Sequence, residues 1–554
     1  MSLDSAQPGD GSPARPRTAI AARIPLVLLA VAVAGSAAFI LGLTSKITFV
    51  TDEWDLLLLR SGWGAGQLLD PFHEHIVLAP AFIYKVFQTL FGMDSARPYQ
   101  LAATGTFLLT AVLFFAYVRR RVGDWAALIM ACLILFLGAA FEDLLWAFQI
   151  GYFGSLAAGL SALIALDRDD RRGDVCASVL LVVSLCFSSL GLPFVAGAAA
   201  EWILNPRDRG RRIFVPGAAI LLFALWWLGW GHRAESELSL SNIPDLPSYL
   251  FTAISAGFTA IAGLATGDGS EPDQPHLIWG KLFLVVALLL AAWRLRRRGS
   301  VPRGLLVVAT AGLAFYLLAG LNQSDLRPPA SSRYQLPSAI FILLTASWVL
   351  EGLRIRAAAL IAAALISALA IGNGLQLMKD QAESRWQPGS QSLLTSLGAI
   401  DLAGDTVRSG YTLLLGLDRP VPIAEYRRAT DDFGSPGKSE AELADGDSAE
   451  RVTADSTLVN ALGIELAGRP AARRSRCGPL KAGEARTPPG RSLDIFNRGK
   501  DDLGIALARF SDPPGVEIGS ILPGVSAGLD LPRDRSVRPW RIAITRGGPA
   551  EVCG

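Results

Sequence analysis

The sequence lacks a strong net charge of either sign, because its 51 Lys and Arg residues and 49 Asp and Glu residues leave a formal charge of +2. A chain without a basic excess has no overall field to attract nucleic acid, so we expect no nucleic-acid partner. The sequence also contains no GxxxxGK[ST] loop and no strand-linked GxGxxG motif, which argues against nucleotide chemistry. None of its five cysteines forms a CxxC pair of the kind used in zinc or redox sites.

Charged residues are scarce altogether, at 18% of the chain, whereas hydrophobic residues make up 51% and the mean hydropathy is +0.38. This composition is too apolar for a soluble protein of 554 residues. Repeated apolar runs approach the roughly 20 residues that cross a bilayer as a helix. The sequence therefore predicts an α-helical polytopic membrane protein with about eleven transmembrane helices. They are expected at 24–43, 99–118, 124–141, 149–166, 174–188, 190–204, 213–230, 276–293, 304–321, 336–350 and 357–377.

Arginine-rich loops set the expected orientation, since basic loops stay on the cytoplasmic side of a membrane. These loops are 119–121, 168–172, 207–212, 294–303 and 354–356. Residues 1–23, rich in Ser, Pro and Gly, are predicted to be a disordered cytoplasmic tail. Residues 24–377 then form the transmembrane domain, with a first outer loop at 44–98. Abundant Ala, Gly and Arg favour a bacterial inner (plasma) membrane.

Two segments of this domain are ambiguous by hydropathy. Residues 76–92 are apolar but contain Lys85 and Gln88, and we interpret them as an interfacial or re-entrant helix. Residues 174–204 lie between two basic loops and therefore cross the membrane twice or not at all. We predict a hairpin of two short helices that is broken near Gly191-Leu192-Pro193.

Everything after about residue 378 lacks an apolar run long enough to span and is expected on the outer face. Residues 378–465 form a mixed linker region whose charged part, 425–455, is predicted to be mobile. Residues 466–554 contain short alternating segments (SLDIFN, GIALARF, VEIGSIL, WRIAIT) between Gly, Pro and Asp turns, which predicts a small β-rich domain. In an oxidising compartment Cys477 and Cys553 are expected to form a disulfide.

The first outer loop begins with Asp52-Glu53-Trp54, where the first span reaches the outer interface. Acidic side chains beside a bilayer are costly unless water, a partner or a substrate holds them. A buried carboxylate becomes basic enough to deprotonate a hydroxyl, which makes Asp52 and Glu53 candidate catalytic residues. The alternative is a hydrated loop with Trp54 as an interfacial anchor.

The same loop contains His73-Glu74-His75, with two of the four histidines of the chain. On a strand His73 and His75 would point the same way, and with Asp52 or Glu53 they could bind a divalent cation. Substrate contact and a purely structural role are the alternatives.

Two further outer segments carry charge. Glu142 and Asp143 lie in a tight turn, and a second acidic pair on the same side as Asp52-Glu53 favours a shared polar cavity over helix-end solvation. Arg327 and Arg333 lie in loop 322–335, against the positive-inside trend, and a guanidinium suits bidentate binding of phosphate. The alternatives are an ion pair with Asp325 or contact with a lipid headgroup.

This arrangement resembles the C superfamily of glycosyltransferases (GT-C). The similarity covers roughly the first 350 residues. It is carried by the acidic motif Asp52-Glu53, the long first outer loop, the acidic pair Glu142-Asp143 and the segment Arg333-Tyr334-Gln335-Leu336-Pro337. A C-terminal extracytoplasmic domain adds to it. The resemblance implies a membrane enzyme that transfers a sugar from a polyprenyl-phosphate donor to a glycan, lipid or protein acceptor.

The same resemblance implies roles for individual residues. Asp52 or Glu53 would be the general base, and Arg333 would stabilise the leaving lipid phosphate. Trp54, His73, His75, Glu142, Asp143, Arg327 and Tyr334 would contact substrate or orient the acceptor. Some GT-C members use a divalent metal ion and others do not, so the cofactor stays open. A WWD motif is absent, which disfavours transfer to asparagine.

Two other classes of function fit parts of the pattern. A transporter or flippase would line its pathway with acids, although transporters usually place polar residues at the membrane midplane in broken helices. A non-catalytic envelope scaffold would use its β domain to bind polysaccharide, and would keep its function after the substitution Asp52→Asn.

Overall fold

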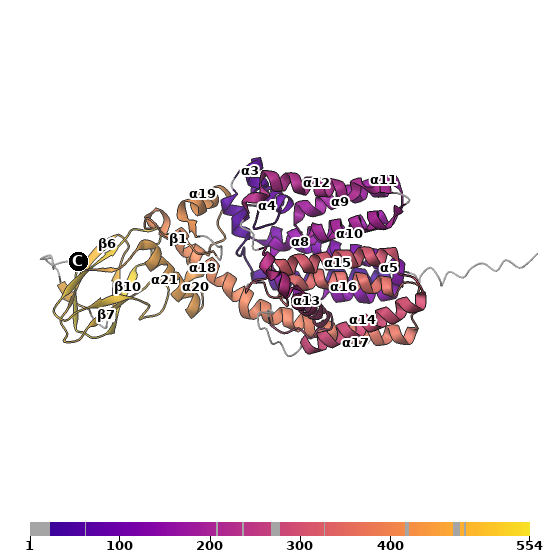
Figure 1. Ribbon diagram of the computed structural model, residues 1–554. Coiled ribbons are helices and arrows are strands. Elements are labelled where there is room, and N and C mark those ends of the chain that lie inside the picture. The colour runs from indigo at the N-terminus through magenta and orange to yellow at the C-terminus, as the bar shows by residue number, and fades with distance from the viewer. Residues whose placement is uncertain are drawn as a thin grey trace, which may run out of the picture.

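The amino-terminal two-thirds of the chain form a bundle of long helices that run side by side, as shown by a computed structural model (Figure 1). It describes residues 23–554 except 61, 207–208, 235–237, 268–276, 326, 416–419, 469–476 and 481–483. The predicted disordered tail, 1–23, lies almost wholly outside the described residues. The long helices are α2 (Ile24–Leu43), α5 (Arg97–Val122), α6 (Asp124–Leu135), α8 (Ile150–Leu166), α9 (Arg171–Phe187), α10 (Gly191–Leu204), α12 (Phe214–Gly229), α13 (Leu246–Ile261), α14 (Leu277–Arg298), α15 (Arg303–Leu321), α16 (Gln335–Val349) and α17 (Ala357–Gln381).

Short helical elements connect them. These are η1 (Thr44–Lys46), η2 (Asp55–Leu59), α3 (Ala65–Leu68), α4 (Leu78–Phe91), η3 (Gly138–Ala140), α7 (Phe141–Leu145), η4 (Ala147–Gln149), α11 (Arg209–Arg212), η6 (Gly231–Arg233), η7 (Leu240–Asp245) and η8 (Ser332–Tyr334). Helix α4 occupies the segment predicted as interfacial or re-entrant, and it ends at Gly92, whose φ of 69° favours glycine. Helices α9 and α10 form the predicted hairpin, with the break at Ser188–Leu190.

The prediction of a polytopic helical protein with a β-rich C-terminal domain is confirmed. Within the described residues, eight helices are long and apolar enough to cross a membrane. Each of the eleven predicted spans coincides with a helix, but α9, α10 and α16 have only 17, 14 and 15 residues. The exact number of spans therefore stays a prediction.

The segment between the predicted spans 213–230 and 276–293 contains the helix α13, which the sequence analysis did not predict. Tyr249, Ala253 and Ala260 of α13 are buried, and the helix packs against α14, α15 and α16. Its sequence mixes Ser, Thr, Gly and Ala with larger apolar residues, which lowers the hydropathy on which the prediction relied. The small residues have a packing role, since Gly280 of α14 leaves no room for a Cβ atom against Ser255.

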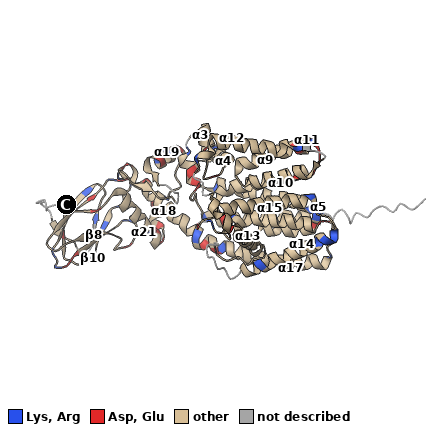
Figure 2. Cartoon of the chain, in the orientation of Figure 1, with Lys and Arg blue, Asp and Glu red and all other residues tan. Residues whose placement is uncertain are grey.

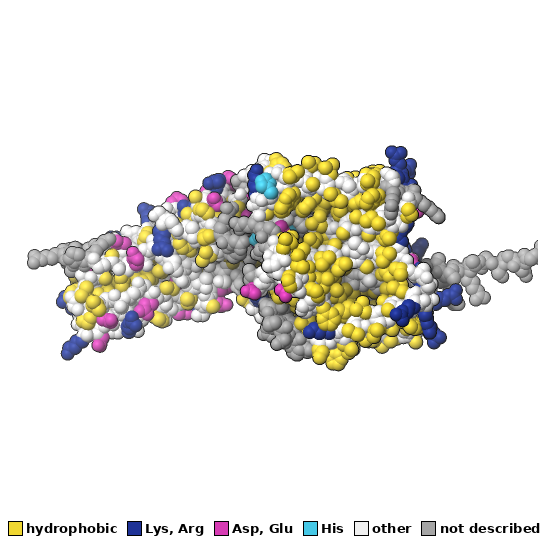
Figure 3. All heavy atoms as spheres, in the orientation of Figure 1, with side chains coloured by type: hydrophobic (Ala, Val, Ile, Leu, Met, Phe, Trp, Pro, Cys, Tyr) yellow, Lys and Arg dark blue, Asp and Glu magenta, His cyan; other side chains and the backbone are white. Residues whose placement is uncertain are grey.

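Basic residues gather at one end of the bundle, opposite the C-terminal part of the chain (Figure 2). We call this the basic end, and it includes Arg119–Arg121, α11 and the last turn of α14. The other end, next to the C-terminal part, is called the domain end. Hydrophobic side chains cover most of the visible side of the bundle between the two ends (Figure 3). This distribution is the one expected for a protein that crosses a bilayer.

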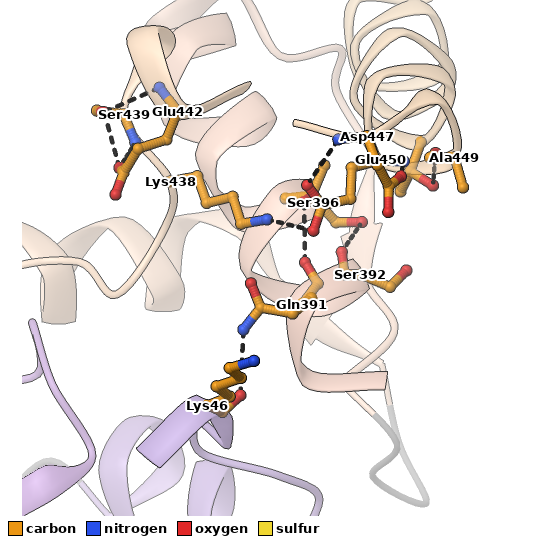
Figure 4. Close-up of polar contacts among 12 residues, drawn as sticks. Lys46, Gln391, Ser392, Ser396, Lys438, Ser439, Glu442, Asp447, Ala449 and Glu450 are labelled. Carbon is orange, nitrogen blue, oxygen red and sulfur yellow. Dashed lines mark hydrogen bonds and ion pairs between the residues drawn. The ribbon is translucent and has the colours of Figure 1, made fainter. Parts of the chain in front are cut away.

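Helix α17 leads out of the bundle at the domain end. It continues through a π-helical turn, η9 (Ala382–Trp386), into α18 (Gln387–Ala403), which reaches the C-terminal part (Figure 1). The amide of Gln391 donates a hydrogen bond to the carbonyl oxygen of Lys46 at 3.1 Å (Figure 4). The amide of Gln387 donates to the carbonyl oxygen of Leu43 at 2.9 Å. These bonds connect α18 directly to the end of the first span.

The segment 425–455 is ordered, so the prediction that it is mobile was wrong. It forms α19 (Ile423–Phe433), α20 (Glu440–Asp445) and the first half of α21 (Ser448–Leu462), after the short strands β1 (Thr412–Leu413) and β2 (Val421–Pro422). Its charges have structural partners: Ser439 with Glu442 and Asp447 with Glu450 form capping boxes (Figure 4). The sequence analysis inferred mobility from the high charge of this segment and did not take these local partners into account.

The C-terminal domain consists of two antiparallel sheets. One has the order β5 (Glu484–Thr487), β10 (Trp540–Arg546), β7 (Leu503–Ala508), β8 (Val516–Ile521); the other has the order β3 (Leu466–Ala467), β9 (Ser526–Leu531), β6 (Arg491–Asn497), β11 (Ala550–Cys553), β4 (Cys477–Pro479). Apolar side chains of both sheets, such as Ile495 and Ile505, share one core with α21. The predicted disulfide between Cys477 and Cys553 is present and joins β4 to β11.

Candidate functional site

A cavity of about 680 Å³ lies at the domain end of the bundle. It is bounded by the first loop, the start of α8, the break between α9 and α10, α12, α15 and the segment before α16. Its polar lining comprises Asp52, His73, Glu74, His75, Gln149, Tyr152, Ser188, Ser189, Asn322, Arg327, Arg333 and Tyr334. Six of the predicted site residues, three from the first outer loop and three from loop 322–335, thus line the same space.

Asp52 and its neighbour Glu53 have different surroundings. Asp52 lines the cavity and lies close enough to Arg333 for their charges to interact. Glu53 is only 1% exposed, is not among the lining residues and accepts hydrogen bonds from the Tyr84 hydroxyl (2.7 Å) and the Val50 backbone N–H (2.9 Å). Thr51, the residue directly before Asp52, has a φ of 39°, which is a strained value for a β-branched residue. The turn therefore directs one acid into the cavity and the other into the protein.

Burial sets the protonation of Glu53. Removal from water raises its pKa to about 8, and the negative charge of Asp52 adds to this effect, while the bonds from Tyr84 and Val50 oppose it. Glu53 is therefore mostly neutral near pH 7. Trp54 is also fully buried; it packs edge-on against Phe49 with ring centroids 5.7 Å apart and lies outside the cavity lining.

The first loop is folded around Arg60. Its guanidinium group donates to the carboxylate of Asp55 at 2.7 Å and to the carbonyl oxygens of Gln67, Asp70 and Pro71. Because Arg60 is only 7% exposed, these contacts fix the path of the loop toward the cavity. The sequence analysis did not identify Arg60, although an Arg among carboxylates and turn residues in an outer loop was a usable signal.

The histidines lie on a tight turn at the tip of this loop and not on one strand. Phe72 and His75 exchange both backbone hydrogen bonds, and His73 between them has a φ of 47°. Both histidines line the cavity. Burial lowers the pKa of His75 and keeps its ring neutral, and its Nδ1 has no hydrogen-bond partner among the residues that the structure describes.

Glu74, between the two histidines, holds Arg327. Its Oε1 accepts hydrogen bonds from Arg327 Nη1 at 3.0 Å and from Asn322 Nδ2 at 2.7 Å. The loop tip is also bound by Ser189 of the α9–α10 break, whose hydroxyl donates to the Glu74 carbonyl at 3.2 Å. Arg327 therefore lines the cavity as half of an ion pair with Glu74.

Arg333 is positioned by the turn at 142–143. Its backbone N–H donates to Glu142 Oε2 at 3.1 Å, and its Nε lies 3.5 Å from the same oxygen. The Ser332 hydroxyl links the same segments, since it accepts from the Glu142 N–H and donates to the Ala139 carbonyl. Asp143 is fully buried, and neither of its carboxylate oxygens has a hydrogen-bond partner within the described part of the chain. Glu142 thus orients Arg333 toward the cavity.

The rest of the cavity lining is apolar, which the sequence analysis did not predict; we call the two sets of lining residues its polar half and its apolar half. The apolar half comprises Leu190, Leu192 and Pro193 at the break and the start of α10, Phe223, Ala224, Trp227 and Leu228 of α12, Leu238, and Phe315, Leu318 and Ala319 of α15. Leu228 is also 74% exposed, so the apolar half reaches the surface of the bundle at α12. The rings of Phe148 and Trp146, stacked 5.3 Å apart, line the same cavity. Such residues give no distinctive sequence signal, because every span is apolar.

The side chains do not fit a metal ion. In the described ranges no group of three or more His, Cys, Asp and Glu side chains lies close enough to hold one. The carboxylates nearest to the histidines and to Asp52 are engaged elsewhere, Glu74 by Arg327 and Glu53 by Tyr84. No step of the chemistry below is therefore assigned to a metal.

No family model matches the chain, and no curated protein sequence matches it. Among solved structures it is similar to the crystal structure of ArnT from Cupriavidus metallidurans bound to undecaprenyl phosphate. The TM-score is 0.44 and the sequence identity 14%, over 73% of this chain and 87% of that chain.

Proposed function

We propose that the protein is a membrane glycosyltransferase that moves a sugar from a polyprenyl-phosphate donor to an acceptor hydroxyl at the domain end of the bundle. The observation that carries this proposal is the two-part cavity, in which a carboxylate and two arginines share one space with an apolar chamber. An amphiphile with an anionic head and a hydrocarbon tail matches both parts. The basic end would face the cytoplasm of a bacterial cell, and the domain end the outside.

The polar half suits the binding of a phosphate. Arg333 and Arg327 both line the cavity, and each pairs with a carboxylate, Arg333 with Glu142 and Arg327 with Glu74. Guanidinium groups held in place in this way bind phosphate oxygens without first having to be ordered. The apolar half, at the surface of α12, would receive the first units of the polyprenyl chain directly from the bilayer.

Asp52 is the residue to which we assign the role of general base. In the transfer, the acceptor hydroxyl gives its proton to the Asp52 carboxylate as its oxygen bonds to the anomeric carbon. The bond from that carbon to the phosphate oxygen breaks, and the phosphate leaves with the electron pair. Arg333 stabilises the negative charge that develops there. Glu53 cannot be this base in its present position, because it is buried, neutral and outside the cavity lining.

The test is sugar transfer by purified full-length protein in lipid nanodiscs, with a panel of radiolabelled polyprenyl-phosphate sugars and a cell-envelope acceptor extract. Asp52→Asn should lower kcat by about 100-fold or more, as expected for loss of a general base. Arg333→Ala should lower it by about 100-fold, as expected for loss of a charge-stabilising donor.

The matched controls are Asp70→Asn and Arg233→Ala. Both residues are exposed, lie in segments at the domain end and are outside the cavity lining. Each control should retain wild-type transfer. Undiminished transfer in Asp52→Asn would refute the assignment of the base. Absence of transfer by the wild type with every donor, together with unaltered function of Asp52→Asn in cells, would favour the scaffold that the sequence also allowed.

A further inference from the structure

The arginines at the basic end fall into two groups that differ in their counter-charges. The first group lies around α8–α11. There Arg121 pairs with Asp167 at 2.9 Å, and Arg212 pairs with Glu201 at 2.7 Å. The rest of this group follows the same pattern: Arg119 with Asp124, Arg120 with Asp167, Arg168 with Asp170, Arg211 with Asp174 and Arg303 with Glu201. Six carboxylates thus lie among the arginines of this corner: Asp124, Asp167, Asp169, Asp170, Asp174 and Glu201.

The second group lies where α14 ends and α17 begins, and we call it the α14/α17 arginine cluster. It consists of Arg294, Arg296, Arg297, Arg298, Arg354 and Arg356. Glu351 is the single acid in these two segments; its carboxylate pairs with Arg298 at 2.9 Å and its carbonyl accepts from Arg294 at 3.3 Å. Among the residues that the structure describes, Arg296, Arg354 and Arg356 have no acidic partner. The positive-inside rule explains why cations lie at this end, but not why six acids accompany the first group and only Glu351 the second.

The two groups of arginines also differ in how much of the neighbouring helices is buried. In the apolar stretches of α14 and α17, only 17% and 11% of the residues are buried, against 78% in the span that contains α8. Trp293, directly before the cluster and one turn before Arg297, is 51% exposed, and the guanidinium of Arg297 lies over its ring at 4.3 Å. An exposed Trp under an Arg at the end of an apolar helix is typical of the headgroup level of a bilayer. The missing counter-charges therefore have to come from the membrane or from solution.

We propose that the α14/α17 arginine cluster is a binding site for anionic phospholipid headgroups. Arg296, Arg354 and Arg356 would bind the phosphate, while Trp293 lies at the glycerol level and the exposed apolar residues of α14 contact the acyl chains. Clusters of Lys or Arg at the cytoplasmic end of membrane helices attract anionic lipids, whereas zwitterionic lipids offer no net charge. Phospholipid is favoured over free phosphate because the cluster stands directly above exposed apolar helix surface. This site lies at the opposite end of the bundle from the proposed active site and does not depend on it.

The test measures lipid preference in the full-length protein. Purified protein in a neutral detergent is equilibrated with equal amounts of phosphatidylglycerol and phosphatidylcholine of the same acyl chains, and bound lipids are counted by native mass spectrometry. The variant Arg296→Gln/Arg354→Gln removes two cations of the cluster. The matched control, Arg120→Gln/Arg168→Gln, removes two exposed cations of the paired corner, whose side chains are 52% and 57% exposed.

Wild type and control should bind several times more phosphatidylglycerol than phosphatidylcholine, and the cluster variant should lose most of that preference. An equal loss in the control would show that net charge alone decides, and would overturn the proposal. So would displacement of the lipid by millimolar inorganic phosphate. If the cluster variant does not fold, the wild type alone is measured from about 0.1 M to 1 M salt. The screening length shrinks over this range from about 10 Å to 3 Å. A lipid preference that does not change over this range would also overturn the proposal.

Discussion

Glu53→Gln should make the protein more stable at neutral and alkaline pH, although it removes a hydrogen-bonded acid from a buried site. In the folded protein the pKa of Glu53 is about 8, mainly because of burial, against an ordinary value of 4.5. The neutral acid and glutamine have almost the same shape. The glutamine oxygen can accept from the Val50 N–H, and its amide can donate to the Tyr84 hydroxyl, so both contacts of Glu53 are retained.

The magnitude follows from the two pKa values. Between pH 4.5 and 8 the unfolded chain has lost the Glu53 proton and the folded chain still holds it, so the folded wild type loses stability as pH rises through this window. At 1.36 kcal/mol per unit, the loss is about 3 kcal/mol at pH 7 and about 5 kcal/mol at pH 8 and above. Glutamine does not titrate and escapes this loss. With an unfolding entropy of about 2.1 cal/mol/K per residue, 5 kcal/mol corresponds to about 4 °C in Tm for a chain of this length.

The assay is thermal unfolding of purified wild type, Glu53→Gln and Asp70→Asn in the same detergent at pH 5, 6.5 and 8. Asp70→Asn alters an exposed acid of the same loop and should follow the wild-type profile. The Tm difference between Glu53→Gln and wild type should be near zero at pH 5 and grow to about 4 °C at pH 8. A Glu53→Gln variant that is less stable at all three pH values, or that runs parallel to the wild type, would refute the reasoning.

Three other substitutions have expected outcomes in the same thermal and transfer assays. Arg60→Ala should lower both Tm and transfer activity, because it releases the loop from four partners; normal activity would contradict its positioning role. Asp174→Asn should cost about 3 kcal/mol, since it leaves the buried Arg212 short of an acid; an unchanged Tm would contradict this. Cys553→Ser opens a disulfide that spans 76 residues and should destabilise the β domain by about 4 kcal/mol, measured by its susceptibility to protease; resistance equal to the wild type would argue against it.

The helical part could be predicted from the sequence because hydropathy and the arginine loops report directly on the membrane. Each predicted span coincides with a helix, and the ambiguous hairpin broke within three residues of the expected place. The helix α13 was missed because its burial comes from contacts with α14 and α16, made through small residues that hydropathy scores as neutral. The order in 425–455 was missed for a related reason, since local capping and the Lys438–Glu450 pair outweigh the high charge.

The polar residues of the site could be predicted from the sequence, but the separate role of each residue could not. Acids and cations at one end of a membrane bundle are rare enough to be noticed, and Asp52, Arg327 and Arg333 indeed line one cavity. Nothing in the sequence distinguishes Asp52 from Glu53, because the direction of each side chain is set by the turn at Thr51. The apolar lining of the cavity could not be predicted from the sequence, because its residues resemble those of any span.

The contacts of the site join residues that lie far apart in the sequence. Glu74 and Arg327 are 253 residues apart, and Glu142 and Arg333 are 191 apart, so neither arginine is oriented until most of the bundle has formed. The C-terminal part contributes as well: Trp386 in the π-helical turn packs against Trp146 at 6.3 Å, and Trp146 stacks on Phe148 in the cavity wall. π-Helical turns within longer helices occur frequently at functional sites. Trp386 therefore contacts a residue of the cavity wall, in addition to the connection that η9 makes between the bundle and the C-terminal part.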